Sequence, residues 1–100
     1  MTGSNYEIVS SQEKLGGGWQ LRLLEDDVEL FSKLFPIDQA KSNFVLAILW
    51  WNKLTADGRK YWRTHAPSDR ICQAYRLFLL AEAYAEAELE AYAWLDSREA

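Results

Sequence analysis

The spacing of the apolar residues changes at Phe35-Pro36, and this change constrains the fold more than any other feature of the chain. Before it, residues 19–23 alternate between apolar and polar side chains, which is the period of a β-strand with one buried face. After it, apolar residues recur every three or four positions, as on an amphipathic helix. The sequence therefore predicts an α+β protein, with a small three-stranded antiparallel sheet in residues 5–36 and a helical half in residues 38–97, in the order β-β-β-α-α-α.

Two turns divide the first part of the chain into three expected strands. The first strand covers residues 6–10, with Tyr6 and Ile8 on one face. The glycines at 16–18 form the first turn, and Asp26-Asp27 can form the second.

The third segment, residues 28–35, fits either a strand or a helix. As a strand, it would place Val28, Leu30 and Leu34 on one face. As a helix capped by one of the preceding aspartates, it would also have an apolar face. Pro36 ends the element in either case, and local pattern alone does not choose between them.

The rest of the chain is expected to form three helices. Asp38 is a candidate N-cap for the first, and Thr55 for the second, which would end at Ala66-Pro67. Ser68 would start a long third helix that ends near Ser97. The inward stripe of the first helix is predicted to be Phe44, Ala47, Ile48, Trp51 and Leu54. That of the third is predicted to be Ile71, Ala74, Phe78, Ala81, Ala85, Leu89 and Tyr92.

A chain of 100 residues, 49% of them hydrophobic, is expected to form a single domain over residues 1–100. Its one core should bring Trp19, Leu21 and Leu23 together with Phe78. A single cysteine cannot form an internal disulfide, and the N-terminal residues lack the basic and apolar segments of a signal peptide. The longest apolar run is far shorter than the ~20 residues that span a bilayer. A cytoplasmic protein without membrane contact is predicted.

Four short sequences resemble those of a group of small bacterial proteins that recur on integrative elements, plasmids and prophages. They are GGGWQLRLLEDD at 16–27, Phe35-Pro36, AEAY at 81–84 and Trp94-Leu95. The resemblance favours a strand for residues 28–35, although the group often has glycines where this chain has LFSKL at 30–34. It implies an accessory protein of a mobile element. Such proteins are often inhibitors of host defence, anti-CRISPR proteins among them.

Little in the sequence could support catalysis. His65 and Cys72 are the only histidine and cysteine, and neither a third catalytic group nor a glycine-rich oxyanion element accompanies them. A partly buried histidine and a buried cysteine are therefore expected. Two such ligands are too few for zinc, and the glycines at 16–18 precede a strand rather than a helix, unlike a phosphate-binding loop. We predict a protein that is not an enzyme and that has no cofactor and no metal.

A basic segment lies in the middle of the chain. Residues 41–76 hold seven basic and two acidic side chains. Arg59 and Arg63 are one turn apart on the expected second helix, with Lys60 beside them and Trp62 nearby. Interleaved positive charge and aromatic surface is a pattern that can bind nucleic acid.

An acidic stripe follows on the expected third helix, where Glu82, Glu86 and Glu90 are spaced four apart. Like charges at this spacing repel one another. The stripe should therefore either pair with the basic residues around Arg59 and Arg63 within the fold or face a basic partner.

Trp50 and Trp51 lie about 100° apart on one helix, so one inward face cannot centre on both. Since Trp51 belongs to the predicted inward stripe, Trp50 is expected to be partly exposed or buried only against a second chain. Tryptophan is enriched among the residues that dominate binding energy at interfaces.

These patterns predict a non-enzymatic binding protein that occupies a surface of a host protein or protein complex, with inhibition of a defence complex as the leading hypothesis. The alternatives are a homodimeric nucleic-acid-associated accessory protein and a toxin–antitoxin or regulatory partner. The residues predicted to contact the partner are Trp50, Arg59, Trp62, Arg63, Glu82, Glu86 and Glu90.

Overall fold

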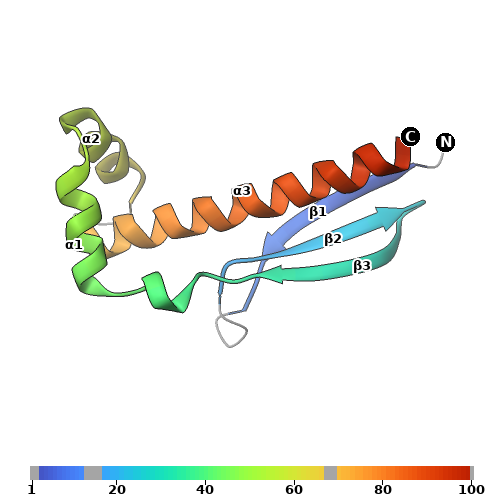
Figure 1. Ribbon diagram of the computed structural model, residues 1–100, viewed down its shortest axis with the longest axis horizontal. Coiled ribbons are helices and arrows are strands. Elements are labelled where there is room, and N and C mark those ends of the chain that lie inside the picture. Colours follow the sequence, from blue (N-terminus) through green and yellow to red (C-terminus); the bar gives the residue numbers. More distant parts are fainter. Residues whose placement is uncertain (1–2, 13–16, 67–69, 100) are drawn as a thin grey trace. The chain divides into compact units, whose positions relative to one another are not determined.

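The computed structural model describes residues 3–12, 17–66 and 70–99, and it confirms the predicted α+β order. Gly16 of the expected first turn and Ser68 of the expected third helix lie outside the described residues. The elements are the strands β1 (Ser4–Ser10), β2 (Trp19–Glu25) and β3 (Val28–Phe35), the short 3-10 helix η2 (Gln39–Lys41), and the helices α1 (Phe44–Lys53), α2 (Ala56–His65) and α3 (Ile71–Glu99) (Figure 1). Residues 28–35 form a strand, as the resemblance favours.

The chain divides into two compact units, and α3 contributes to both. Unit 1 comprises Met1–Pro36 and Glu82–Ala100, and unit 2 comprises Ile37–Ala81. The predicted change from strands to helices near Pro36 agrees with the order of the elements. The sequence does not show that the C-terminal part of the long helix belongs with the sheet.

The sheet of unit 1 is an antiparallel meander in the order β1-β2-β3. Asp26 and Asp27 connect β2 to β3 as predicted, with φ angles of 56° and 66°. A two-residue hairpin loop of type I′ requires positive φ at both positions, and aspartate tolerates that conformation better than most residues.

β3 contains a bulge that simple alternation does not predict. Glu29 and Phe31 pair with neighbouring residues of β2, so Leu30 is an extra residue between them. Because the bulge shifts the alternation by one position, Val28 and Leu34 lie on opposite faces of the sheet. The prediction that Val28, Leu30 and Leu34 share one face is therefore wrong.

The core of unit 1 lies between the sheet and the C-terminal part of α3. Leu21 and Leu23 pack against Ala87 and Ala91, and all four side chains are buried. Small side chains spaced four apart allow a helix to approach a sheet closely. Partly buried residues that pack against this cluster are Tyr6, Ile8, Phe35 and Trp94. The predicted inward faces of β1 and β2 are thus confirmed.

Ala74 of α3 is buried as predicted, but from Ala81 onward the helix buries a different face from the one predicted. The buried residues of this helix are Ala74, Tyr75, Leu79, Ala83, Ala87 and Ala91. Ala81, Ala85, Leu89 and Tyr92, all expected in the core, are exposed instead. Alanine and larger apolar residues occur on both sides of the helix, so periodicity could not identify the side that faces the sheet.

The core of unit 2 forms where α1 meets the N-terminal part of α3. Its buried residues are Ile37, Ala47, Tyr75 and Leu79. Phe78 packs against this cluster, whereas Leu21 and Leu23 belong to the cluster of unit 1. The predicted common core of β2 and Phe78 is therefore wrong.

The caps of the helices agree with the sequence, with one correction. Thr55 caps α2 as predicted. Asp38 caps η2 and not α1, because its carboxylate accepts a hydrogen bond from the Ala40 N–H at 2.9 Å. The N-cap of α1 is Asn43, whose side-chain oxygen accepts from the Leu46 N–H at 2.9 Å.

Candidate partner-binding surfaces

α1 is apolar on two opposite sides. On the inner side Ala47 is only 1% exposed, whereas Val45 and Leu49 on the outer side are 65% and 50% exposed. Phe44, which is 62% exposed, lies one turn before Ala47 at the edge of the inner side. Val45, Leu49 and Lys53 follow one another at intervals of four residues, so they lie in a row along the helix. We call the exposed residues Val45, Leu49 and Lys53 the α1 outer face. Clustered large apolar side chains on a surface mark sites of interaction.

The sequence contains a signal for this surface that the predicted inward stripe of the first helix does not include. Residues 44–51 are all apolar, so the helix has no polar side to turn toward water. A ten-residue helix of this kind must either be enclosed on all sides or expose apolar residues, and α1 does the latter.

A pocket of about 190 Å³ lies on the inner side of α1, and Phe44, the neighbour of Val45 in the chain, lines it. Its lining residues are Ile37, Ser42, Asn43, Phe44, Ala47, Cys72, Tyr75, Arg76 and Leu79. Pockets for drug-sized ligands measure roughly 300–1,000 Å³, so this one suits a single side chain of a partner better. Cys72 is exposed here, whereas the sequence predicted a buried cysteine.

Trp50 and Trp62 belong to an aromatic cluster inside unit 2. The Trp50 ring centroid lies 5.1 Å from that of Phe78 and 5.7 Å from that of Trp62. Trp50 also packs against the buried cluster around Tyr75. Both tryptophans are half-buried, so Trp50 is partly exposed as predicted, whereas the prediction that Trp51 is buried in the core is wrong. Trp50 nevertheless packs within unit 2 and not only against a second chain.

Trp51 is covered by two arginine side chains of α2. The guanidinium carbons of Arg59 and Arg63 lie 5.7 Å and 5.2 Å from the centroid of its ring. Arg59 Nε also donates a hydrogen bond to the Trp51 carbonyl oxygen at 3.2 Å. Arg59 and Arg63 thus share a face as predicted, and that face serves a contact within unit 2.

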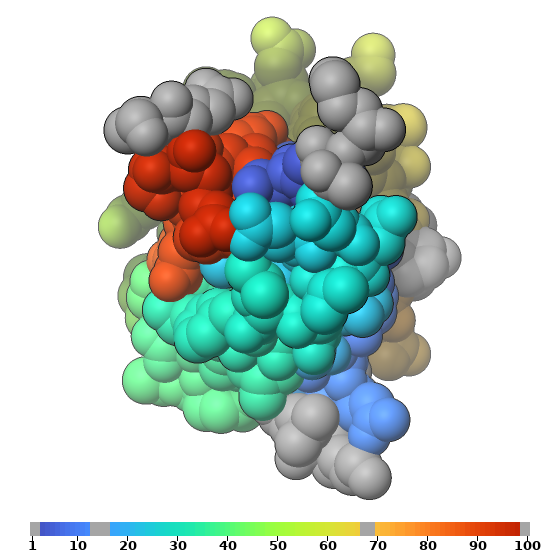
Figure 2. Space-filling view, turned by 90° about the vertical axis from the view of Figure 1, so that its right-hand side faces the viewer, coloured from blue at the N-terminus to red at the C-terminus, as the bar shows by residue number. Residues whose placement is uncertain are grey.

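The acidic residues of α3 have different surroundings from one another. Glu90 pairs with Lys33 of β3 at 3.0 Å, and not with a residue of α2 as one reading of the sequence predicted. Glu82 is half-buried, and Glu86 is exposed. At the end of unit 1, Arg98 pairs with Glu25, where the last turn of α3 (red in Figure 2) lies beside β2 (cyan).

A second exposed apolar row lies on α3. Ala85, Leu89, Tyr92 and Asp96 are spaced by three or four residues and therefore share a side of the helix, away from Ala87 and Ala91. All four are exposed, and Leu89 reaches 70%. We call these four residues the α3 outer stripe. Glu86 lies on its flank and adds negative charge.

Tyr92 connects this stripe to β1. Its hydroxyl accepts a hydrogen bond from the Tyr6 hydroxyl at 3.4 Å and donates one to Glu88 at 3.0 Å. The contact with Tyr6 and the nearby Glu88 carboxylate raise the pKa of Tyr92 above its ordinary value. Glu88 does so because it accepts the phenol's hydrogen bond and its negative charge disfavours the phenolate.

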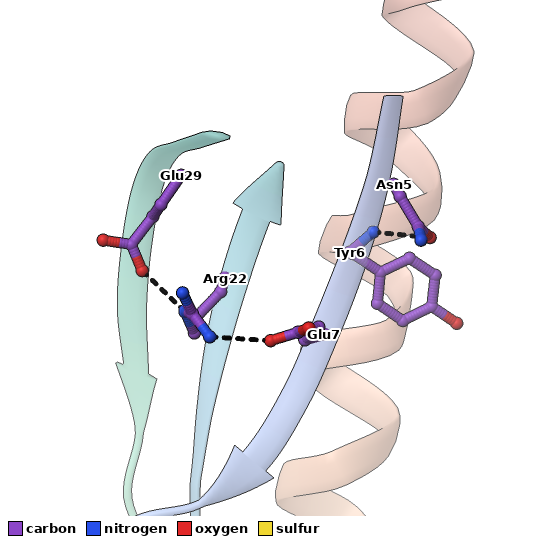
Figure 3. A network of polar contacts seen from close by, with 5 residues as sticks. All are labelled: Asn5, Tyr6, Glu7, Arg22 and Glu29. Atoms are coloured by element: carbon purple, nitrogen blue, oxygen red, sulfur yellow. Dashed lines mark hydrogen bonds and ion pairs between the residues drawn. The ribbon is translucent and has the colours of Figure 1, made fainter. Parts of the chain in front are cut away.

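Arg22 joins the three strands on the sheet face that β2 turns away from α3. Its guanidinium lies 2.7 Å from a carboxylate oxygen of Glu7 on β1 and 2.7 Å from one of Glu29 on β3 (Figure 3). The hydrogen bond that Arg22 donates to Glu29 and the negative charge of Glu7 raise the pKa of Arg22. This arrangement has a structural role, since one side chain bridges both neighbouring strands.

His65 and Cys72 are the residues that the sequence singled out as possible catalytic or metal-binding groups. His65 is exposed and not partly buried as predicted; its ring stacks on Tyr61 at 4.2 Å between centroids. Among the described residues, histidine, cysteine and acidic side chains form no group of three or more that could hold a metal ion. Within the same part of the chain, every helix is too short or too polar to cross a bilayer.

Comparisons with protein-family models, with curated proteins and with solved structures find no match to this chain.

Proposed function

We propose that the protein is a non-enzymatic binding module that contacts a protein partner through the α1 outer face and the adjacent pocket. One observation carries the proposal. Val45 and Leu49 are each at least half exposed on the side of α1 opposite Ala47, which is buried in the core of unit 2, and Phe44 at the start of the helix is 62% exposed. Covering clustered apolar side chains with a partner removes them from water, which favours association.

The composition of the surface supports a protein as the partner. A large aromatic side chain, Phe44, stands at the border of a pocket of about 190 Å³, so a partner could both cover the ring and insert a side chain beside it. Polar groups of Ser42, Asn43 and Arg76 line the same pocket. An apolar centre with a polar rim is the usual anatomy of a protein interface.

Nucleic-acid binding is the less well supported alternative. Lys60 and Arg63 are exposed, and unit 2 has an excess of basic residues. However, Arg59 and Arg63 cover the Trp51 ring, and Trp50 and Trp62 pack on each other, so these indole rings serve contacts inside the unit. Base stacking needs an aromatic face that is open to the strand. The narrower role of a mobile-element inhibitor of host defence stays a prediction that rests on the resemblance.

The proposal is tested by affinity capture with matched variants. The tagged chain and a Val45→Ser, Leu49→Ser variant are used as bait in bacterial lysate, and the captured proteins are quantified by mass spectrometry. Val28→Ser is the control, because Val28 is also an exposed valine, at 60%, but lies on β3. We expect the double variant to lose at least tenfold of a specific partner that the control retains.

Circular dichroism establishes beforehand that all three chains are folded. Equal capture by the wild type and the double variant would show that the α1 outer face does not bind the partner. Loss of capture in the presence of nuclease, with no effect of the double variant, would support the nucleic-acid alternative instead.

A further inference from the structure

The two units carry opposite charge, and each presents an exposed apolar helix face. Unit 1 contains twelve acidic and four basic side chains, whereas unit 2 contains seven basic and three acidic ones. The α3 outer stripe belongs to the acidic unit, and the α1 outer face belongs to the basic unit.

From this we infer that the partner covering the α1 outer face is a second copy of this chain, which docks its α3 outer stripe there. The inference rests on the proposed function and names the partner at the same site. The contact is head to tail, since an acidic surface of one copy meets a basic surface of the other.

The two faces match in both apolar and charged groups. Each has an exposed row of apolar side chains on a helix, with Val45 and Leu49 in one and Leu89 and Tyr92 in the other. A charged side chain lies beside each row, and the two charges have opposite signs. Lys53 ends the row on α1, and the exposed Glu86 flanks the row on α3. Helices pack by interlocking such rows at distances that bring flanking charges into range.

Like faces are poorer partners for each other. Two α3 outer stripes would bring together Glu86 and Asp96 of both copies, and two α1 outer faces would bring together two Lys53 side chains. Juxtaposed like charges suppress a contact, whereas opposite charges steer it and fix its register. The charge pattern therefore selects the unlike pair.

The experiment measures self-association of the full chain by sedimentation velocity, from micromolar to millimolar concentration. Val45→Ser and Leu89→Ser should each weaken association roughly tenfold, and Val28→Ser should leave it unchanged. An equimolar mixture of the first two variants should recover a one-to-one complex, because each copy keeps the face that the other lacks. Raising the salt concentration should weaken wild-type association.

A charge exchange tests the register. Lys53→Glu and Glu86→Lys should each weaken association alone, and mixing these two variants should restore it. Circular dichroism confirms that every variant is folded before it is compared.

Three outcomes would overturn the inference: a chain that stays monomeric throughout, association that is insensitive to Leu89→Ser, or failure of the mixed variants to recover. If the chain is monomeric and the Val45→Ser, Leu49→Ser variant still loses a partner from lysate, the proposed function stands and only the second copy is excluded. If neither self-association nor capture of a partner from lysate is weakened by Val45→Ser, the proposed function fails as well.

Discussion

The start of β2 lies so close to the end of β3 that an ideal Cβ on Gly18 would stand 2.1 Å from the carbonyl oxygen of Phe35. Gly18 also has a φ of 72°, in the left-handed region. That conformation costs other residues about 1–2 kcal/mol. Two independent constraints therefore require glycine where the chain enters the central strand.

Replacing Gly18 with alanine should destabilise the protein by at least about 2 kcal/mol, because strain and a backbone clash add to each other. Urea denaturation measures the loss. Gly3→Ala is the matched control, since a Cβ at Gly3 would meet nothing within 4 Å. Equal stability of the two variants would show that β2 and β3 are further apart at this end.

The buried side of α3 is tested by a pair of alanines two positions apart. Ala87 is 0% exposed against the sheet, whereas Ala85 is exposed. Ala87→Leu should cost about 1–3 kcal/mol, because the core has no space for three more carbons. Ala85→Leu should change stability by no more than about 0.5 kcal/mol. Thermal or chemical denaturation at low protein concentration measures the loss of stability in each variant. A larger loss of stability for Ala85→Leu than for Ala87→Leu would show that α3 buries the stripe predicted from the sequence.

Much of the fold was predictable because local signals were unambiguous. Alternation in residues 19–23, paired aspartates at a hairpin and Thr55 before α2 each admit one ready interpretation. The strand at 28–35 was open on pattern alone, because its spacing fits both periods. The bulge at Leu30 could not be foreseen, since it depends on how β3 aligns with β2.

The candidate site was less predictable, because it depends on which side of each helix is covered. α1 is apolar all round, so its sequence does not state whether Trp50 or Trp51 faces inward. α3 has Ala83 and Ala87 on one side and Ala85 and Leu89 on the other, and only the presence of the sheet makes the first pair the core. Tertiary packing, not periodicity, made these choices.

Trp50→Ala should lower the free energy of unfolding more than Trp51→Ala does, which is the reverse of the order predicted from the sequence. Trp50→Ala removes a ring that packs against Phe78 and Tyr75, so it should cost about 3 kcal/mol or more. Trp51→Ala removes a half-buried ring and its two contacts with arginine, which should cost about 1 kcal/mol. Urea denaturation, followed by circular dichroism, compares the two. A greater loss of stability for Trp51→Ala would show that Trp51 is the core residue and that Trp50 is available to a partner.

The hydroxyl chain from Tyr6 through Tyr92 to Glu88 should make stability fall in alkali. The pKa of Tyr92 is raised above the ordinary 10.0, so the folded state favours the neutral phenol more than the unfolded state does. This contribution is complete below pH 10 and is lost as the pH rises through the folded-state pKa. The difference in unfolding free energy between the wild type and Tyr92→Phe should therefore stay constant up to about pH 10 and then shift against the wild type. Glu88→Gln is the control that keeps the hydroxyl but removes the neighbouring charge, and it should reduce the shift. Denaturation at a series of alkaline pH values measures it, and parallel curves for wild type and Tyr92→Phe would mean that the hydroxyl chain does not favour the neutral phenol.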